Sequence, residues 1–336
     1  MKKGNITIKD IAQELNISIS TVSRALADNP LVKLSTREAV KKLAKTYNYK
    51  PNFTALSLRH SKTKTIGVIV PQIVHEFFAL VIRGIEDRCY AAGYNVIVCS
   101  SHEDYEREVV DARAMLTGRV DGVLACVSRT TDNYDHFKEF EERNIPIGFF
   151  DCICPDMQTH RVIIDDIHAG YIATDHLVKS GCRKIAYIGG SEHLKINHDR
   201  RVGYEKALRD HGIAIVPNFI QYCETTDFEE GINISESWIK NKEIDGVFAA
   251  ADMLAIASIK NMKKHGLACP DDIKVVGFSN WSISSIYEPS ISTIDQPGYE
   301  MGYKSAELLL NQINEPEATK FETVVLATEL IHRESS

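Results

Sequence analysis

The chain lacks the sequence features of several large classes of protein. It has no run of about 18 apolar residues, so no segment is suited to span a membrane. The amino terminus, MKKGNITIKD, is basic but is not followed by the apolar stretch of a signal peptide, so we expect a cytoplasmic protein without a membrane partner. We find no H-E-x-x-H motif, no complete phosphate-binding glycine motif and no nucleophile paired with a base. The sequence therefore predicts no enzyme activity and no cofactor.

The eight cysteines do not have the spacing of a metal or redox motif. They form no C-x-x-C and no pairing with histidine at zinc spacing. Most stand inside apolar runs, which indicates buried, reduced thiols, and we expect no metal site. Cys152 and Cys154 are the only close pair, and a metal or redox role for them is the less favoured alternative.

The sequence does contain two short amphipathic helical segments near its amino terminus. Residues 5–26, NITIKDIAQELNISISTVSRAL, carry one apolar stripe before and one after a turn at 15–17. Ser18 is a suitable amino-terminal cap for the second helix. This is a helix-turn-helix pattern, which also occurs in proteins that do not bind DNA. The side chains that would face outwards, as contact with base edges in a major groove requires, are Ile19, Ser20 and Arg24.

Charge is distributed unevenly along the chain. Residues 1–65 have a formal net charge of +9, whereas the remainder has −16, within a total of −7. Residues 36–48 read as a third helix with several lysines on its exposed face. A basic amino-terminal segment on an acidic protein favours binding of nucleic-acid phosphates by that segment alone.

Residues 49–65, YKPNFTALSLRHSKTKT, predict a short helix followed by a basic tether. A helix of about two turns is marginal in water and needs a binding partner to become ordered. Its leucines have too little sequence around them to form a core. An exposed leucine here would pack on a partner chain or insert between base steps in the minor groove.

From Ile66 onwards strands and helices alternate in two successive rounds. Continuous apolar strands such as IGVIV are typical of parallel sheets, and VDGVLACV at 120–127 is echoed by IDGVFAAA at 244–251. The fold class predicted is an all-α helix-turn-helix head with a short helical linker, followed by an α/β body of two lobes, each a doubly wound parallel sheet. We divide the chain into residues 1–50, 51–65 and 66–336.

Ligands of open parallel sheets bind beyond the carboxyl ends of the strands, and two facing lobes would bring two such edges together. Aromatic, acidic, basic and amide side chains at these positions suit a small polyhydroxylated ligand. Phe78 could instead belong to the core, Asp252 could only cap a helix, and at most one of the adjacent Arg200 and Arg201 should face the cleft. The candidate effector-binding residues are Phe77, Phe78, Asp151, Arg200, Asp252, Asn280 and Gln296.

Several motifs together resemble the lactose and purine repressor (LacI/GalR) family of bacterial transcriptional regulators. They include TIKDIAQELNISISTVSRAL, YKPNFTALSLR, VDGVLACV, RRVGYEKALRDHGI, VVGFSN and STIDQPGYEMG, and they cover nearly the whole chain. The resemblance implies base contacts by Ile19, Ser20 and Arg24, and phosphate contacts by Thr21 and Ser23. It also implies that the linker is a hinge helix whose Leu58 inserts at the centre of a pseudopalindromic DNA operator, which requires a homodimer.

The resemblance further implies a body like a periplasmic sugar-binding protein, with three crossovers between its lobes. We place these near 164–167, 292–296 and 320–322, which gives lobe 1 as 66–164 plus 295–321 and lobe 2 as 165–294 plus 322–336. On this division the apolar run Thr323 to Ala327 belongs to the second lobe. The family's tetramerisation heptads are absent, so a dimer is expected.

The implied function is a repressor whose affinity for DNA is controlled by a small-molecule effector, most simply a sugar or sugar derivative. A purine- or corepressor-type regulator, and a catabolite regulator that docks a phosphocarrier protein, remain alternatives. The chain departs from the family pattern at Ser279-Asn280, Ala251-Asp252 and His75-Glu76. Because these positions adjoin the cleft, the effector cannot be transferred from a relative. The rival classes are an exported solute-binding protein and a sugar-processing enzyme.

Overall fold

The computed structural model describes residues 6–49, 62–318 and 320–336. The chain forms two compact units, Met1–Thr63 and Lys64–Ser336. Leu58 and nearly all of the predicted hinge helix lie outside the described residues, while residues 62–64 have no regular structure and Thr65 begins the first strand.

The amino-terminal unit is a three-helix head, formed by α1 (Ile8–Glu14), α2 (Ile19–Leu26) and α3 (Leu34–Thr46). The Thr7 N–H donates to the Asp10 carboxylate at 2.7 Å at the start of α1. In α2 the Ser18 hydroxyl accepts from the Thr21 N–H at 3.1 Å, as the sequence predicted. Asn16 makes the tight turn between the two helices with a φ of 49°, a conformation that asparagine tolerates well. The core side chains are Ile11, Ala12, Val22, Ala25, Val32, Val40 and Ala44.

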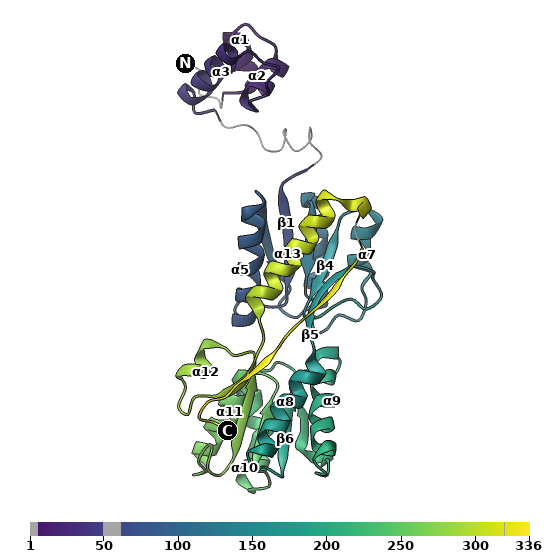
Figure 1. Cartoon of the computed structure of the whole chain (residues 1–336), viewed down its shortest axis with the longest axis vertical. Coiled ribbons are helices and arrows are strands. Elements are labelled where there is room, and N and C mark those ends of the chain that lie inside the picture. Colours follow the sequence, from purple (N-terminus) through teal and green to yellow (C-terminus); the bar gives the residue numbers. More distant parts are fainter. Residues whose placement is uncertain (1–5, 50–61, 319) are drawn as a thin grey trace. The chain divides into compact units, whose positions relative to one another are not determined.

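The second unit contains two lobes, each built on a six-stranded sheet (Figure 1). The first sheet has the order β11-β5-β4-β3-β1-β2 and is parallel throughout. Its strands are β1 (Thr65–Val70), β2 (Asn95–Ser100), β3 (Gly122–Ala125), β4 (Ile147–Phe150), β5 (His160–Ile164) and β11 (Thr323–Leu326). The helices of this lobe are α5 (Glu76–Ala91), α6 (Tyr105–Gly118), α7 (Asp135–Glu142) and α13 (Gly298–Asn314), followed by a 3-10 turn at Pro316–Ala318.

The second sheet has the order β12-β10-β9-β8-β6-β7, in which only the edge strand β12 runs antiparallel to its neighbour. Its strands are β6 (Ile185–Gly189), β7 (Ile220–Tyr222), β8 (Gly246–Ala249), β9 (Lys274–Phe278), β10 (Ser292–Asp295) and β12 (Glu329–Ile331). The helices are α8 (Asp166–Lys179), α9 (Lys195–Asp210), α10 (Phe228–Lys240), α11 (Asp252–Lys264) and α12 (Ser282–Ile286), with a 3-10 turn at Pro217–Phe219.

Burial explains why the strands are continuous apolar runs. All residues of β1 except the first are buried, and so is every residue of β6, because helices cover both faces of each sheet. The predicted fold class, a helix-turn-helix head followed by two parallel α/β lobes, is confirmed for the head and the body.

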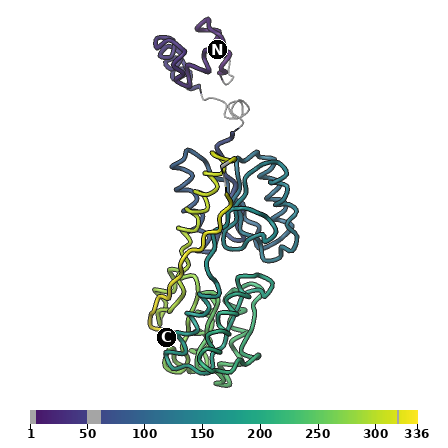
Figure 2. The backbone as a smooth tube through the Cα atoms, turned by 45° about the vertical axis from the view of Figure 1, so that its right-hand side comes forward, coloured from purple at the N-terminus to yellow at the C-terminus, as the bar shows by residue number. Residues whose placement is uncertain are grey.

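The end of the chain differs from the prediction. Thr323–Leu326 does not join the second lobe but forms β11, which pairs with β5 of the first sheet in the register Thr323↔Arg161. The chain then crosses at Ala327 and Thr328 to reach β12 in the second sheet. Figures 1 and 2 show these last strands running from one lobe into the other. A four-residue apolar run suits either sheet, and the open edge of β5 decides the pairing.

Candidate functional site

The outer face of α2 carries the side chains predicted to contact DNA. Val22 and Ala25 are fully buried, whereas Ser20 and Arg24 are exposed and Ile19 is 45% exposed. Thr21 and Ser23 are of intermediate exposure. The Ser18 hydroxyl lies 2.8 Å from the hydroxyls of both Ser20 and Thr21, so the cap also orients the first turn of this face.

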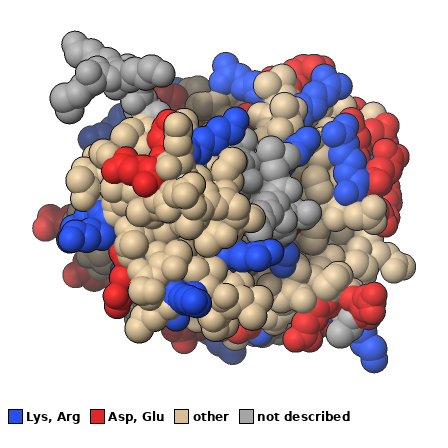
Figure 3. Space-filling view, turned by 90° about the horizontal axis from the view of Figure 1, so that it is seen from above, with Lys and Arg blue, Asp and Glu red and all other residues tan. Residues whose placement is uncertain are grey.

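The lysines of α3 are not equivalent. Lys41 donates to both carboxylate oxygens of Asp28, at 2.5 and 2.6 Å, and this hydrogen bond lowers the pKa of Asp28. Lys42 and Lys45 are exposed. Figure 3 shows Lys and Arg side chains together with acidic and uncharged residues in one view of the chain.

A cavity of about 110 Å³ lies between the two lobes of the body. Five of the seven predicted effector-binding residues line it: Phe77, Phe78, Asp151, Arg200 and Gln296. The aromatic pair stands in the first turn of α5, and Asp151 follows β4. Gln296 stands between β10 and α13, where the chain passes from the second lobe to the first. Both lobes and one crossover thus contribute to the cavity wall.

Asp151 is held from two sides. Its Oδ1 accepts from Gln296 Nε2 at 2.7 Å, and its Oδ2 lies 3.9 and 3.8 Å from the Sγ atoms of Cys126 and Cys152. Burial raises the pKa of this carboxyl, although the charge of Arg200 opposes the shift. Asp151 has a φ of 57°, a left-handed conformation at the strand end that turns the chain.

Arg200 lies within α9 and not directly beyond the end of a strand, where the sequence analysis placed the candidate residues. The helix begins at Lys195, so Arg200 stands in its second turn. The guanidinium group donates from Nε to Asp166 Oδ1 at 2.8 Å and from Nη1 to the Ala250 carbonyl at 3.2 Å. It also lies 3.7 Å from the centre of the Phe278 ring. Burial raises the pKa of Asp166 to about 6, against the opposing effect of Arg200.

The start of α5 contacts the second lobe beside the cavity. The His75 ring meets the Trp281 ring edge-on, with 4.2 Å between centroids. Next to it, Glu76 accepts hydrogen bonds from the backbone N–H of Ser282 at 2.9 and 3.1 Å and from its hydroxyl at 3.0 Å. Burial lowers the pKa of His75 to about 4, and the charge of Arg200 adds to this shift.

Two predicted residues do not line the cavity. Asp252 is fully buried, where its carboxylate accepts from the Thr293 hydroxyl at 2.6 Å and from the Trp281 N–H at 2.7 Å. Asn280 donates to Asp295 and accepts from Arg333, each at 2.7 Å. Both follow strand ends as expected, but position along a strand does not determine where a side chain points.

The sequence reasoning also missed cavity residues. Cys126 and Glu103 lie just beyond β3 and β2. The strand-end rule, that ligands bind beyond the carboxyl ends of parallel strands, would have identified both residues if it had been applied to these two strands. Asn197 lies on α9, where its Nδ2 donates to the Ser191 carbonyl at 2.9 Å, and no sequence signal marks it. The close pair of cysteines in space is Cys126 and Cys152, whereas Cys154 does not line the cavity.

Comparison with known proteins agrees with this arrangement of head and body. Residues 7–52 match the bacterial regulatory proteins of the lacI family, and residues 174–336 match the periplasmic binding protein-like domain. The chain is 34% identical to the HTH-type transcriptional regulator RegA of Clostridium saccharobutylicum, over 98% of this chain and 99% of that protein. The chain belongs to the lacI family.

Other lacI-family proteins are similar over most of their length. Catabolite control protein A of Priestia megaterium is 32% identical, over 92% of this chain and 93% of its own. Among solved structures, the complex of the transcriptional regulator CelR with cellobiose has a TM-score of 0.74 at 27% identity and covers 98% of this chain and all of its own. As a member of the lacI family, the protein is a DNA-binding transcriptional regulator. In the described ranges, no helix is both long and apolar enough to cross a membrane.

Proposed function

We propose that this lacI-family protein binds a pseudopalindromic DNA operator as a homodimer and represses transcription in the cytoplasm. A small molecule held between the lobes controls its affinity for the operator. The observation that carries this proposal is the cavity itself, whose wall is shared by Asp151 of one lobe, Arg200 of the other and Gln296 at a crossover. A ligand that bridges the lobes binds one lobe arrangement more tightly than another, which is the condition for control of a second site.

The cavity favours a sugar or sugar derivative as the effector. Two carboxylates, two guanidinium groups and three amides line it together with the Phe77 and Phe78 rings, whose centroids lie 5.2 Å apart. Polar groups that pair with hydroxyls beside aromatic faces suit a polyhydroxylated ligand. The relatives include the ribose operon repressor of Halalkalibacterium halodurans at 30% identity and the CelR complex with cellobiose.

A catabolite regulator that docks a phosphocarrier protein is the second candidate. The similarity to catabolite control protein A favours it. In that case a partner protein, and not only a small molecule, would raise operator affinity. Adding a purified bacterial phosphocarrier protein, phosphorylated and unphosphorylated, to an operator-binding assay distinguishes the two candidates.

In the head we propose that Ile19, Ser20 and Arg24 contact bases and that Thr21 and Ser23 contact phosphates. The exposure of the α2 face supports this assignment. Leu58 would insert at the operator centre. On the first lobe, Ile97 of β2 and Val110 of α6 are 50% and 62% exposed, and burial of these side chains against a second copy would favour the homodimer.

The first experiment screens sugars, sugar phosphates and purines for stabilisation of the full-length protein against thermal unfolding. The operator is selected from random duplexes, and its affinity is measured by fluorescence anisotropy with and without the stabilising compound. We expect a change in affinity of about 5- to 150-fold, the usual range of allosteric coupling. A compound that binds the cavity without changing operator affinity contradicts the proposed control. Recovery of the compound chemically altered would instead support an enzyme.

Arg24→Ala provides a separate test of base recognition. We expect a loss of about 1–3 kcal/mol for the selected operator and relaxed preference at one base pair of each half-site, because a bidentate contact to a base is lost. The matched control is Lys42→Ala on the exposed face of α3, which should weaken binding to all sequences similarly. Equal losses by Arg24→Ala on all sequences would assign Arg24 to the phosphates.

A further inference from the structure

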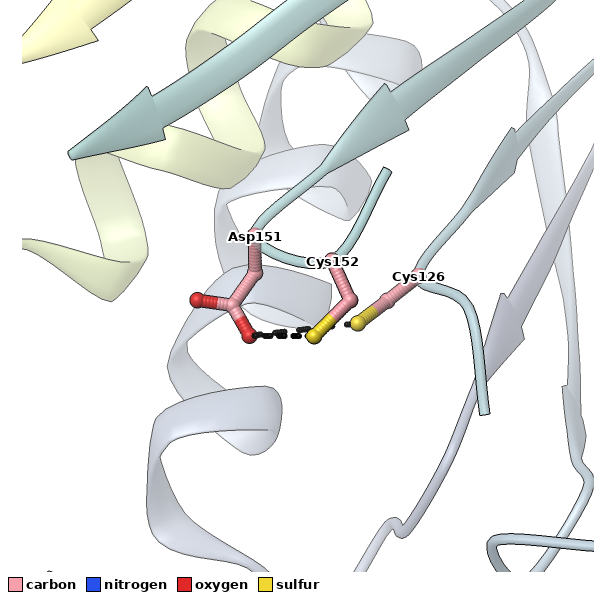
Figure 4. A group of neighbouring side chains, drawn as sticks. All are labelled: Cys126, Asp151 and Cys152. Carbon is pink, nitrogen blue, oxygen red and sulfur yellow. Dashed lines mark hydrogen bonds between the residues drawn. The ribbon is translucent and has the colours of Figure 1, made fainter. Parts of the chain in front are cut away.

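Three side chains with metal-ligating atoms meet in the wall of the cavity. The Sγ atoms of Cys126 and Cys152 and a carboxylate oxygen of Asp151 all lie within 4.8 Å of one another. Figure 4 shows a carboxylate oxygen of Asp151 and the two sulfur atoms lying next to one another at the ends of two neighbouring strands. The Val127 N–H donates to the Cys152 carbonyl at 3.0 Å, so the backbone on which the group stands is fixed by the sheet.

The spacing is close to that of a tetrahedral metal site. With Zn–S distances of about 2.3 Å and Zn–O distances of about 2.0–2.2 Å, the ligand atoms of a tetrahedral site are separated by roughly 3.5–3.8 Å. The Asp151 Oδ2 lies 3.9 Å from the Cys126 Sγ and 3.8 Å from the Cys152 Sγ. These two distances are within a few tenths of an ångström of the tetrahedral values, and the two Sγ atoms lie no more than 4.8 Å apart, so shifts of up to about 1 Å would bring the three atoms onto one ion.

The surroundings suit a cation held by these ligands. Gln296 Nε2 donates to the Oδ1 of Asp151 at 2.7 Å and leaves Oδ2 directed at the thiols. Residues that surround a metal site commonly orient its ligands by such hydrogen bonds. The positive charge that acts on Asp151, that of Arg200, is paired with Asp166 at 2.8 Å. All three ligating residues line the cavity, so a fourth coordination position would face it.

The protonation of the thiols sets a condition on binding. Burial raises the pKa of Cys126 well above its ordinary value. At Cys152 a hydrogen bond with Cys126 lowers the pKa, but burial and nearby carboxylates outweigh it and the pKa is raised. Without a cation both residues are thus neutral thiols. A divalent cation would displace the two protons into solvent and form two metal–thiolate bonds.

We propose that Cys126, Asp151 and Cys152 bind one thiophilic divalent cation of the Zn²⁺ type per chain, with the fourth position open to the cavity. Two thiolates select such an ion over Mg²⁺ or Ca²⁺, which prefer oxygen ligands. Binding of the ion does not require operator binding, although Asp151 belongs both to this site and to the proposed effector site. Any effector in the cavity would then lie beside the ion.

The test uses full-length, reduced, metal-free protein titrated with Co²⁺ as a spectroscopic probe. We expect one Co²⁺ per chain, with the intense near-ultraviolet absorption of cobalt–thiolate bonds, and its displacement by Zn²⁺ but not by Mg²⁺. Cys126→Ser and Cys152→Ser each remove a direct metal ligand. Each should weaken Co²⁺ binding by more than the roughly 10- to 100-fold that is typical when a residue that only orients a metal ligand is changed. The controls are Cys154→Ser, which removes a buried thiol two residues away, and Cys99→Ser on β2 of the same lobe.

A second measurement on the unmutated protein keeps the proposal testable if a variant fails to fold. Alkylation followed by mass spectrometry should show that Zn²⁺ protects Cys126 and Cys152 and that a chelator removes the protection. The proposal is overturned if the protein binds no Co²⁺, if the absorption survives in Cys126→Ser, or if protection appears only at other cysteines. Operator affinity of the metal-free protein, measured in parallel, reports on the proposed function separately.

Discussion

His75 joins the cavity to the contact between the lobes. Its ring lies edge-on to Trp281, and its Nδ1 is buried with no hydrogen-bond partner among the described residues. A charged imidazole is disfavoured in this position, which is why burial lowers its pKa to about 4 from an ordinary value of 6.5. If the lobes separate, we expect the ring to regain water and its ordinary pKa. The contact between the lobes at His75 therefore favours the neutral imidazole.

This difference predicts the pH dependence of lobe closure. Above pH 6.5 His75 is neutral in both arrangements and does not affect closure. As the pH falls from 6.5 toward 4 the open arrangement takes up a proton that the closed one excludes, so closure becomes less favourable. We expect effector affinity to fall in this window, and less steeply in His75→Gln, as measured by calorimetry. Burial also raises the pKa values of Asp166 and Asp252 to about 6. Because both residues are present in the unmutated protein and in His75→Gln, they do not account for a difference between the two pH profiles. Identical pH profiles would contradict the prediction.

At the scale of elements, each lobe contains a pair of helices that approach backbone to backbone. A Cβ on Gly302 of α13 would lie 1.9 Å from the Val81 carbonyl oxygen of α5, and one on Gly84 would lie 2.1 Å from that of Tyr299. The second lobe contains the same kind of close helix pair, because a Cβ on Gly203 of α9 would lie 2.1 Å from the Ile167 carbonyl oxygen of α8. The backbones cannot yield as a flexible side chain would, so only glycine permits these separations.

Gly302→Ala should therefore destabilise the body. We expect a loss of about 1–3 kcal/mol in the free energy of unfolding, the usual cost of overpacking, measured by urea denaturation. Gly118→Ala is the matched control, since Gly118 ends α6 and a Cβ added there would have no atom within 4 Å among the described residues. Alanine there should be neutral or stabilising by up to about 1 kcal/mol. Similar losses in both variants would show that helix separation is not the cause.

At the scale of the whole body, the start of α5 supplies polar contacts that join the two lobes. Glu76 at the start of α5 accepts three hydrogen bonds from Ser282 at the start of α12, which join the first lobe to the second. Glu76→Ala removes them and should shift the population toward separated lobes. For a half-buried group we expect about 1 kcal/mol, or a roughly fivefold loss of effector affinity.

Small-angle scattering and calorimetry measure the two consequences of Glu76→Ala together. The radius of gyration of the full-length protein should increase and the affinity should fall. Glu86→Ala, an exposed position on the same helix, is the control and should change neither. If Glu76→Ala lowers affinity while the scattering stays that of the unmutated protein, Glu76 acts on the ligand and not on closure.

Local pattern was enough to predict the elements and their order. The apolar spacing of α2 placed Val22 inside and Arg24 outside, Ser18 capped the helix as expected, and the buried runs became the parallel strands. The strand-end rule found Asp151 and Gln296 for the same reason, since it depends only on where a parallel strand stops. These properties arise from residues close together in the chain, and periodicity records them directly.

Only the tertiary structure decided which distant residues meet. Thr323–Leu326 could have paired with either sheet, and the free edge of β5 selected the first. Asp252 turned into the core while Arg200 turned into the cavity from a helix, because side-chain direction depends on the packing of neighbouring elements. The spacing of the cysteines in the chain gave no sign that Cys126 and Cys152 stand side by side. That proximity follows from the pairing of β3 with β4, a long-range contact that no local pattern encodes.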